Sequence, residues 1–201
     1  MDAALCMDLV TAAAVATTQP IRRVLDVGCG AGNYSLKMRV HCPEAVFSLV
    51  DLSQPMLQRA SERLGANTLL YQGDIREIEF GESHFDVILA AAVLHHLRTP
   101  EEWHHVFSKF FSWLRVGGSL WVFDLVAHEI SEVHDLMRRR YKDYLIEFGG
   151  SDYQEKVFAY VCREDTPTSL TYQLSLANAV GFSKTEVLHK NGSFAAYGTV
   201  K

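Results

Sequence analysis

The 201-residue sequence has no hydrophobic run approaching the length of a membrane span, and positive charge is not in excess. A transmembrane helix needs about 20 consecutive apolar residues. The first twenty residues are largely apolar, but Asp2 and Asp8 interrupt them and no basic segment precedes them, which argues against a secretory signal. The formal net charge of -5 argues against a nucleic-acid binder, which needs a basic face. We therefore expect a cytoplasmic protein without a membrane or nucleic-acid partner, and leave a homodimer open.

Cysteine is scarce, and the four cysteines show neither C-x-x-C pairing nor metal-ligand spacing with a histidine. We therefore expect free thiols in a reducing compartment and predict no metal site. The hydrophobic fraction of 48% and the charged fraction of 21% are ordinary for a globular protein, and this length can bury one good core. We expect a single domain over residues 1–201, beginning with a helix within residues 1–20.

The most informative segment is residues 24–33, in which an apolar strand runs into glycines at alternate positions. Glycine allows positive φ and a close approach of the backbone to a ligand. A loop of this kind, between a parallel strand and a helix, is where an open α/β sheet usually binds a nucleotide-like cofactor. A nicotinamide fingerprint needs a small residue where Asn33 stands, and the last glycine comes one place earlier, at Gly32. The loop suits a smaller zwitterionic group, such as the methionine part of S-adenosylmethionine.

Two acidic residues follow the next two predicted strands. Asp51 ends the strand of residues 46–51, where such a fold places a carboxylate for ribose hydroxyls. Asp74 follows the strand of residues 68–72 and could accept a hydrogen bond from an adenine amino group, with Ile75 and Leu52 on the two faces of the ring. Each acid also has a structural interpretation, Asp51 as a helix cap and Asp74 as a turn former.

These segments, with the fourth strand at residues 85–90 and the following AAVLHHL stretch, resemble class I S-adenosylmethionine-dependent methyltransferases in order and spacing. The resemblance is to the small-molecule, methyltransferase type 11/12-like branch, and the N-P-P-Y type sequence of amino-directed enzymes is absent. It implies methyl transfer from S-adenosylmethionine to a small-molecule acceptor, with S-adenosylhomocysteine as product. The predicted cofactor-binding residues are Asp26, Gly28, Cys29, Gly30, Gly32, Asp51, Leu52, Asp74, Ile75 and Ala91.

The remaining pattern predicts a Rossmann-like, doubly wound α/β fold with a mostly parallel seven-stranded sheet. The expected helices cover residues 3–16, 33–41, 54–64 and 100–114, with Ser53 as the cap of the third. A turn at Gly117-Gly118 is expected to lead into a fifth strand at residues 119–125. Two final strands, residues 184–190 and 193–200, flank Asn191-Gly192 as a tight hairpin that adds an antiparallel strand.

Residues 126–179 break this alternation and are predicted to form a helical lid over the cofactor loop, with helices at residues 129–148 and 153–163. The lid follows the fifth strand, so it should choose the substrate. The arginines at 138–140 are either a solvated helix face or, with one of them turned inward, a contact for an anionic substrate. The predicted substrate-binding residues are Tyr34, Arg138 and Tyr141.

His95 and His96 are the candidate catalytic residues, because they follow the fourth strand, where the family places groups beside the methyl. Imidazole titrates near neutral pH and can accept the acceptor's proton. Each histidine could instead cap a helix or pack in the core, and Asp124, at the end of the fifth strand, is a further candidate.

Two other functions stay open. The insertion and the last ten residues are similar to carboxy-S-adenosylmethionine synthases of tRNA modification, which transform the cofactor itself. That family needs an arginine in the helix before Gly181-Phe182, and residues 171–180 contain none, although the arginines at 138–140 could substitute. The other alternative is a non-catalytic, cofactor-binding subunit that activates a partner.

Overall fold

The computed structural model describes residues 2–201 and contains one seven-stranded sheet. The strand order is β3-β2-β1-β4-β5-β7-β6, in which β7 runs antiparallel to both of its neighbours and the other pairings are parallel. The strands are β1 (Arg23–Val27), β2 (Val46–Asp51), β3 (Thr68–Gln72), β4 (Phe85–Ala91), β5 (Leu114–Leu125), β6 (Lys184–Asn191) and β7 (Phe194–Val200). The predicted doubly wound α/β sheet with a closing antiparallel hairpin is confirmed.

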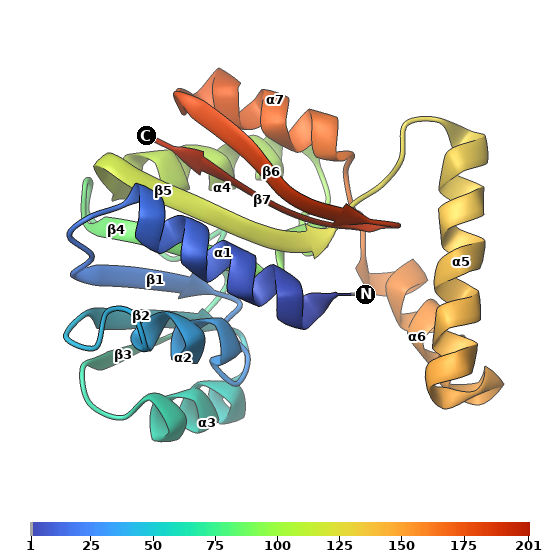
Figure 1. Ribbon diagram of the computed structural model, residues 1–201, viewed down its shortest axis with the longest axis horizontal. Helices are drawn as coiled ribbons and strands as arrows, with labels where there is room; N and C mark the ends of the chain where they lie inside the picture. Colours follow the sequence, from blue (N-terminus) through green and yellow to red (C-terminus); the bar gives the residue numbers. More distant parts are fainter. Residues whose placement is uncertain (1) are drawn as a thin grey trace.

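Helices cover both faces of this sheet (Figure 1). One face packs against α1 (Ala3–Thr17), α2 (Asn33–Arg39) and α3 (Gln54–Leu64), and the other packs against α4 (Pro100–Trp113) and α7 (Leu170–Val180). Successive strand residues serve opposite cores, because side chains alternate along a strand. In β1, Val24 packs in the core under α1, α2 and α3, and Leu25 packs in the core under α4 and α7. This alternation explains why the central strands read as continuous apolar runs.

Two local expectations need correction. Ser53 occupies the N-cap of α3, but its side chain makes no capping hydrogen bond; instead its backbone N–H donates to Asp51 Oδ1 at 2.8 Å. The fifth strand begins at Leu114, five residues earlier than expected, and includes the glycine pair. Gly117 has a φ of 73°, and the pairing register shifts at this end of β4, so the glycines form an irregularity within the strand and not a turn before it.

The insertion after β5 forms the two helices that were predicted, α5 (Ser131–Gly149) and α6 (Ser151–Glu164). They lie beside each other at the end of the sheet toward which the arrows of β1 and β5 point, well away from the other helices (Figure 1). Only Leu145 of α5 and Gln154 of α6 are buried. The pair therefore stands over the carboxyl ends of the strands with little core of its own.

Over residues 2–201, none of the helices combines the length and the apolar character that crossing a bilayer would require.

Candidate active site

The loop between β1 and α2 is fixed by its own backbone. Gly28, Gly30 and Gly32 have φ values of 62°, 50° and 76°, which side-chain-bearing residues rarely adopt. The N–H of Cys29 donates to the carbonyl of Val50 at 3.0 Å, which ties the loop to the neighbouring strand. A Cβ at Gly28 would lie 2.6 Å from Val93 Cγ2, whereas a Cβ at Gly30 would meet nothing within 4 Å. The loop is closely packed at its start and open at its centre.

Asp51 is not the N-cap of α3, a position that Ser53 occupies, but its carboxylate accepts two backbone hydrogen bonds. Its Oδ2 accepts from the Gly30 N–H at 2.8 Å, and its Oδ1 accepts from the Ser53 N–H. The carboxylate thus fixes both the glycine loop and the start of α3. It also lines a cavity at the strand tips, so its remaining lone pairs can accept from a diol there.

Asp74 lies on the same cavity and is held by Arg76. Arg76 Nη2 lies 2.5 Å from Asp74 Oδ2, its Nε donates to Asp74 Oδ1 at 3.0 Å, and its Nη1 pairs with Glu102 at 2.8 Å. The hydrogen bonds from Arg76 lower the pKa of Asp74 from its usual value, against the opposing effect of partial burial. Asp74 therefore stays an acceptor at neutral pH.

This cavity has a volume of about 300 Å³, a size typical of small-ligand sites. Five of the ten predicted cofactor residues line it, namely Gly28, Asp51, Leu52, Asp74 and Ile75. The other five do not line it: Asp26, Cys29, Gly30, Gly32 and Ala91 belong to the loop or to the ends of β1 and β4. The lid contributes Tyr160 and Glu164, and the segment before α4 contributes Arg98, so residues from separate parts of the chain line the cavity.

Asp26 is buried under the glycine loop, with 2% of its surface exposed. Burial raises the pKa of this carboxyl to about 7, although a hydrogen bond from Ser35 Oγ at 2.5 Å opposes the shift. The burial of Cys29 likewise raises the pKa of its thiol well above the usual range. Asp26 thus fixes α2 to β1 through Ser35.

His95 lies in the short helix η1 (Leu94–His96) and is almost fully buried. Its Nδ1 is hydrogen-bonded to Asp124 Oδ1, while Asp124 Oδ2 accepts from the N–H groups of Leu94 at 2.7 Å and His95 at 3.2 Å. Burial disfavours the charged imidazole, but the hydrogen bond to Asp124 and the charges of Asp124 and Asp165 outweigh it and raise the pKa of His95. Asp124 therefore orients the ring, and Nε2 is left on the side of Asp165.

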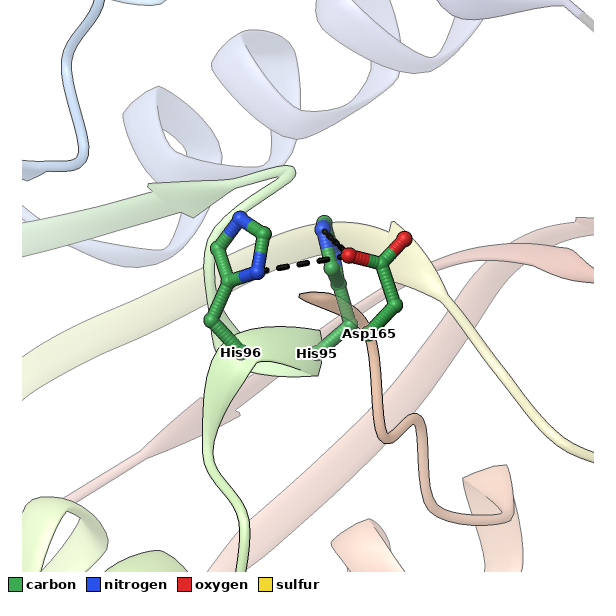
Figure 2. Close-up of side chains that lie close together, drawn as sticks. All are labelled: His95, His96 and Asp165. Atoms are coloured by element: carbon green, nitrogen blue, oxygen red, sulfur yellow. Dashed lines mark ion pairs between the residues drawn. The ribbon is translucent and has the colours of Figure 1, made fainter. Parts of the chain in front are cut away.

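His96, Asp165 and the free side of His95 meet in one cluster (Figure 2). Asp165 Oδ1 lies 3.3 Å from His96 Nδ1 and 3.7 Å from His95 Nε2, and the two imidazole rings have centroids 4.2 Å apart. Thr166 places the carboxylate, because its N–H donates to the His95 carbonyl at 2.7 Å and its hydroxyl to the Leu97 carbonyl at 2.7 Å. The end of the lid is thereby joined to the helix that carries both histidines.

A second cavity, of about 200 Å³, lies under the lid on the other side of this cluster. Asp165, Arg138 and Tyr141 line it, whereas His96 lines the first cavity. Tyr34, the third predicted substrate residue, lines neither cavity; its ring stacks on Phe123 and its hydroxyl is buried. The structure thus brings Arg138 and Tyr141 together and leaves Tyr34 in the core beneath them.

Comparison with known proteins agrees with this geometry. Residues 24–118 match the model of a methyltransferase domain family. Residues 24–118 therefore form a methyltransferase domain of the class I, S-adenosylmethionine-dependent family. It is 32% identical over 142 residues to a malonyl-[acyl-carrier protein] O-methyltransferase of Halalkalibacterium halodurans, a match that covers 67% of this chain and 51% of that protein. The chain spans about half the length of the first curated relatives it matches.

Two further similarities to known proteins cover more of the chain. A carboxy-S-adenosyl-L-methionine synthase of Vibrio atlanticus is 24% identical over 195 residues, covering 91% of this chain and 78% of that protein. The crystal structure of a putative O-methyltransferase from Nostoc punctiforme shares the fold with a TM-score of 0.72 and 19% identity, covering all of this chain and 57% of the other. The predicted family and its cofactor, S-adenosylmethionine, are confirmed.

The residues at the strand tips fit that cofactor. Gly30 leaves open space where a side chain would intrude, and the two acids, which come from different strands, line one cavity. Ile75 and Leu52 line it as well, and Leu52 is 68% exposed at its edge, where a ligand can cover it. The sequence did not indicate Asp165, Glu164 or Tyr160, because residues distant in the chain reach this site only through the path of the lid.

Proposed function

We propose that this chain binds S-adenosylmethionine in the first cavity and transfers its methyl group to a small-molecule acceptor held in the second. The observation that carries the proposal is the position of the His95, His96 and Asp165 cluster between the two cavities. When bound, the cofactor supplies a methyl group already activated by a positive sulfur. The protein has to align the acceptor, exclude water and take up a proton.

Each part of the site has a proposed task. Asp51 accepts from the ribose diol and Asp74 from the adenine amino group, while the glycine loop receives the amino-acid end. His96 is the proposed proton acceptor, because it lines the first cavity and is 41% exposed, and His95 supports it from the buried side. Arg138 and Tyr141 form the wall of the acceptor site.

Calorimetry with S-adenosylmethionine on Asp51→Ala tests the cofactor site. Loss of a hydrogen bond to a charged group costs about 1.5–3 kcal/mol, so affinity should fall by about 10- to 150-fold. Glu44→Ala is the matched control, since this exposed carboxylate precedes β2 at the opposite end of the sheet and should leave affinity unchanged. Unchanged affinity in Asp51→Ala would remove the ribose role from the proposal.

A second candidate function is favoured by the match over 91% of the chain to a carboxy-S-adenosyl-L-methionine synthase. Helix α7 carries no arginine, but Arg138 lies in the second cavity and could receive an added carboxylate. Mass spectrometry of the nucleoside product separates the two functions. Demethylated cofactor together with a methylated acceptor supports methyl transfer, whereas a carboxylated cofactor supports the alternative. Cofactor binding without either product would instead indicate an activating subunit.

A further inference from the structure

The cluster between the two cavities has the composition and geometry of a metal centre. Its three possible ligand atoms, one each from His95, His96 and Asp165, all lie within 4.8 Å of one another. Two imidazoles and one carboxylate are a ligand set that divalent transition metals prefer. We propose that these three residues bind a divalent transition-metal ion, with zinc as the reference ion.

Two of the three distances between the possible ligand atoms suit such an ion. Zinc binds nitrogen and carboxylate oxygen at about 2.0–2.2 Å in a tetrahedral arrangement, which places neighbouring ligand atoms about 3.3–3.5 Å apart. The distances from Asp165 Oδ1 to His96 Nδ1 and His95 Nε2 are 3.3 and 3.7 Å. The two imidazole nitrogens lie within 4.8 Å of each other, so the rings would have to rotate toward one another to complete the coordination.

Asp165 supplies an independent observation. Its side chain is only 5% exposed, yet its Oδ1 has no hydrogen-bond partner among residues 2–201, even with His96 Nδ1 at 3.3 Å. Buried polar atoms are nearly always paired, and one without a partner calls for an explanation such as an ion. The unpaired atom is the one that faces both imidazoles (Figure 2).

The ring nitrogen of His95 that points away from the cluster is already bonded to a carboxylate. A histidine that binds metal usually gives its other ring nitrogen to a carboxylate, which fixes the ring and its tautomer. His95 Nδ1 is bonded to Asp124 Oδ1, and that carboxylate is itself held by two backbone N–H groups. Nε2 is therefore left free on the side of the cluster.

The remaining coordination position would face the cavities, because His96 lines one and Asp165 the other. An ion there acts as a Lewis acid toward an oxygen of the acceptor and lowers the pKa of that group. In that state the imidazoles are ligands, and proton removal no longer depends on His96 as a base. The inference goes beyond the proposed methyl transfer, and the two can fail separately.

The test measures metal binding on the whole chain in the absence of acceptor. Purified protein is stripped with a chelator, then titrated with Zn²⁺ by calorimetry and with Co²⁺ by visible absorption, where a tetrahedral site gives an intense band. One ion per chain is expected. His96→Ala and Asp165→Asn should each weaken Zn²⁺ binding by at least tenfold, and His41→Ala, an exposed histidine outside the cluster, should not.

Thermal unfolding of each variant confirms that it is folded, which Asp165→Asn should preserve by keeping the shape of the side chain. Absence of stoichiometric binding to the wild-type chain would overturn the inference, as would equal affinity in the His41 and His96 variants. The cluster would then be a set of ion pairs between imidazolium and carboxylate. Methyl transfer that persists in chelator, with no metal bound, would overturn the Lewis-acid role of the ion and leave the proposed function standing.

Discussion

The cofactor half of the molecule and the lid half are built by different physical means. Around the glycine loop, backbone hydrogen bonds, buried strands and a carboxylate that accepts from backbone N–H groups hold the chain in place. In α5 and α6 only one residue of each helix is buried, and the helices depend on each other and on the segment at Asp165 and Thr166. The difference suggests that one half keeps the cofactor in place while the other can change with the acceptor.

The largest effect we expect concerns Asp26, the most deeply buried carboxyl of the cofactor half. Its pKa of about 7 when folded exceeds the usual 3.8, so the folded protein keeps a proton that the unfolded chain loses between these pH values. Stability should therefore fall as pH rises from about 4 to about 7, by up to about 4 kcal/mol. Asp26→Asn should abolish this loss, as followed by urea unfolding at several pH values.

The matched control for Asp26 is Asp143→Asn, an exposed carboxylate on α5, which should leave the pH profile as it is in the wild type. A pH profile of Asp26→Asn identical to that of the wild type would contradict the burial argument.

Next in size is Gly28→Ala, which tests how closely the loop is packed. The positive φ costs about 1–2 kcal/mol for a residue with a side chain, and the new Cβ would meet Val93 at 2.6 Å. Displacement of the loop should weaken S-adenosylmethionine binding by about 100-fold in calorimetry. Gly192→Ala is the control, because its φ of 56° carries the same strain with no atom within 4 Å. Equal cofactor affinities in the two variants would show that the close approach to Val93 is unimportant.

The same contrast explains what the sequence could and could not predict. Strands β2 and β3 and helix α3 have the predicted bounds, because each is defined locally by an apolar run or a helical period between turn residues. The early start of β5 was missed, because two glycines read as a turn when the neighbouring strand that pairs with them is not visible. Asp165 was missed for a related reason: its partners lie 69 and 70 positions earlier in the chain, and only the path of the lid joins them.

Within the lid, Leu145→Ala should have a smaller and local effect. Leu145 is 4% exposed and is the buried residue of α5, so its truncation should cost about 2 kcal/mol. Because the lid shares little core with the sheet, we expect faster hydrogen exchange in α5 and α6 and unchanged exchange in β1, β2 and β4. Cofactor affinity should stay within about twofold of the wild type. Faster exchange throughout the sheet would show that lid and sheet unfold as one unit.

The smallest effect we expect is that of Arg138→Gln, which asks whether the lid selects an anionic acceptor. Arg138 lines the second cavity, where its guanidinium lies 5.5 Å from the centroid of the Phe158 ring and 3.3 Å from Cys162 Sγ. A cation–π contact of this exposed kind is worth about 0.5–1 kcal/mol, so the variant should fold normally. If Arg138 pairs with the acceptor, KM for that acceptor should rise about tenfold with little change in kcat. Arg139→Gln, one residue along α5 and outside that cavity, should change neither constant. Equal KM values in the two variants would assign Arg138, like Arg139, to the solvated helix face and leave acceptor choice to Tyr141 and the cluster at Asp165.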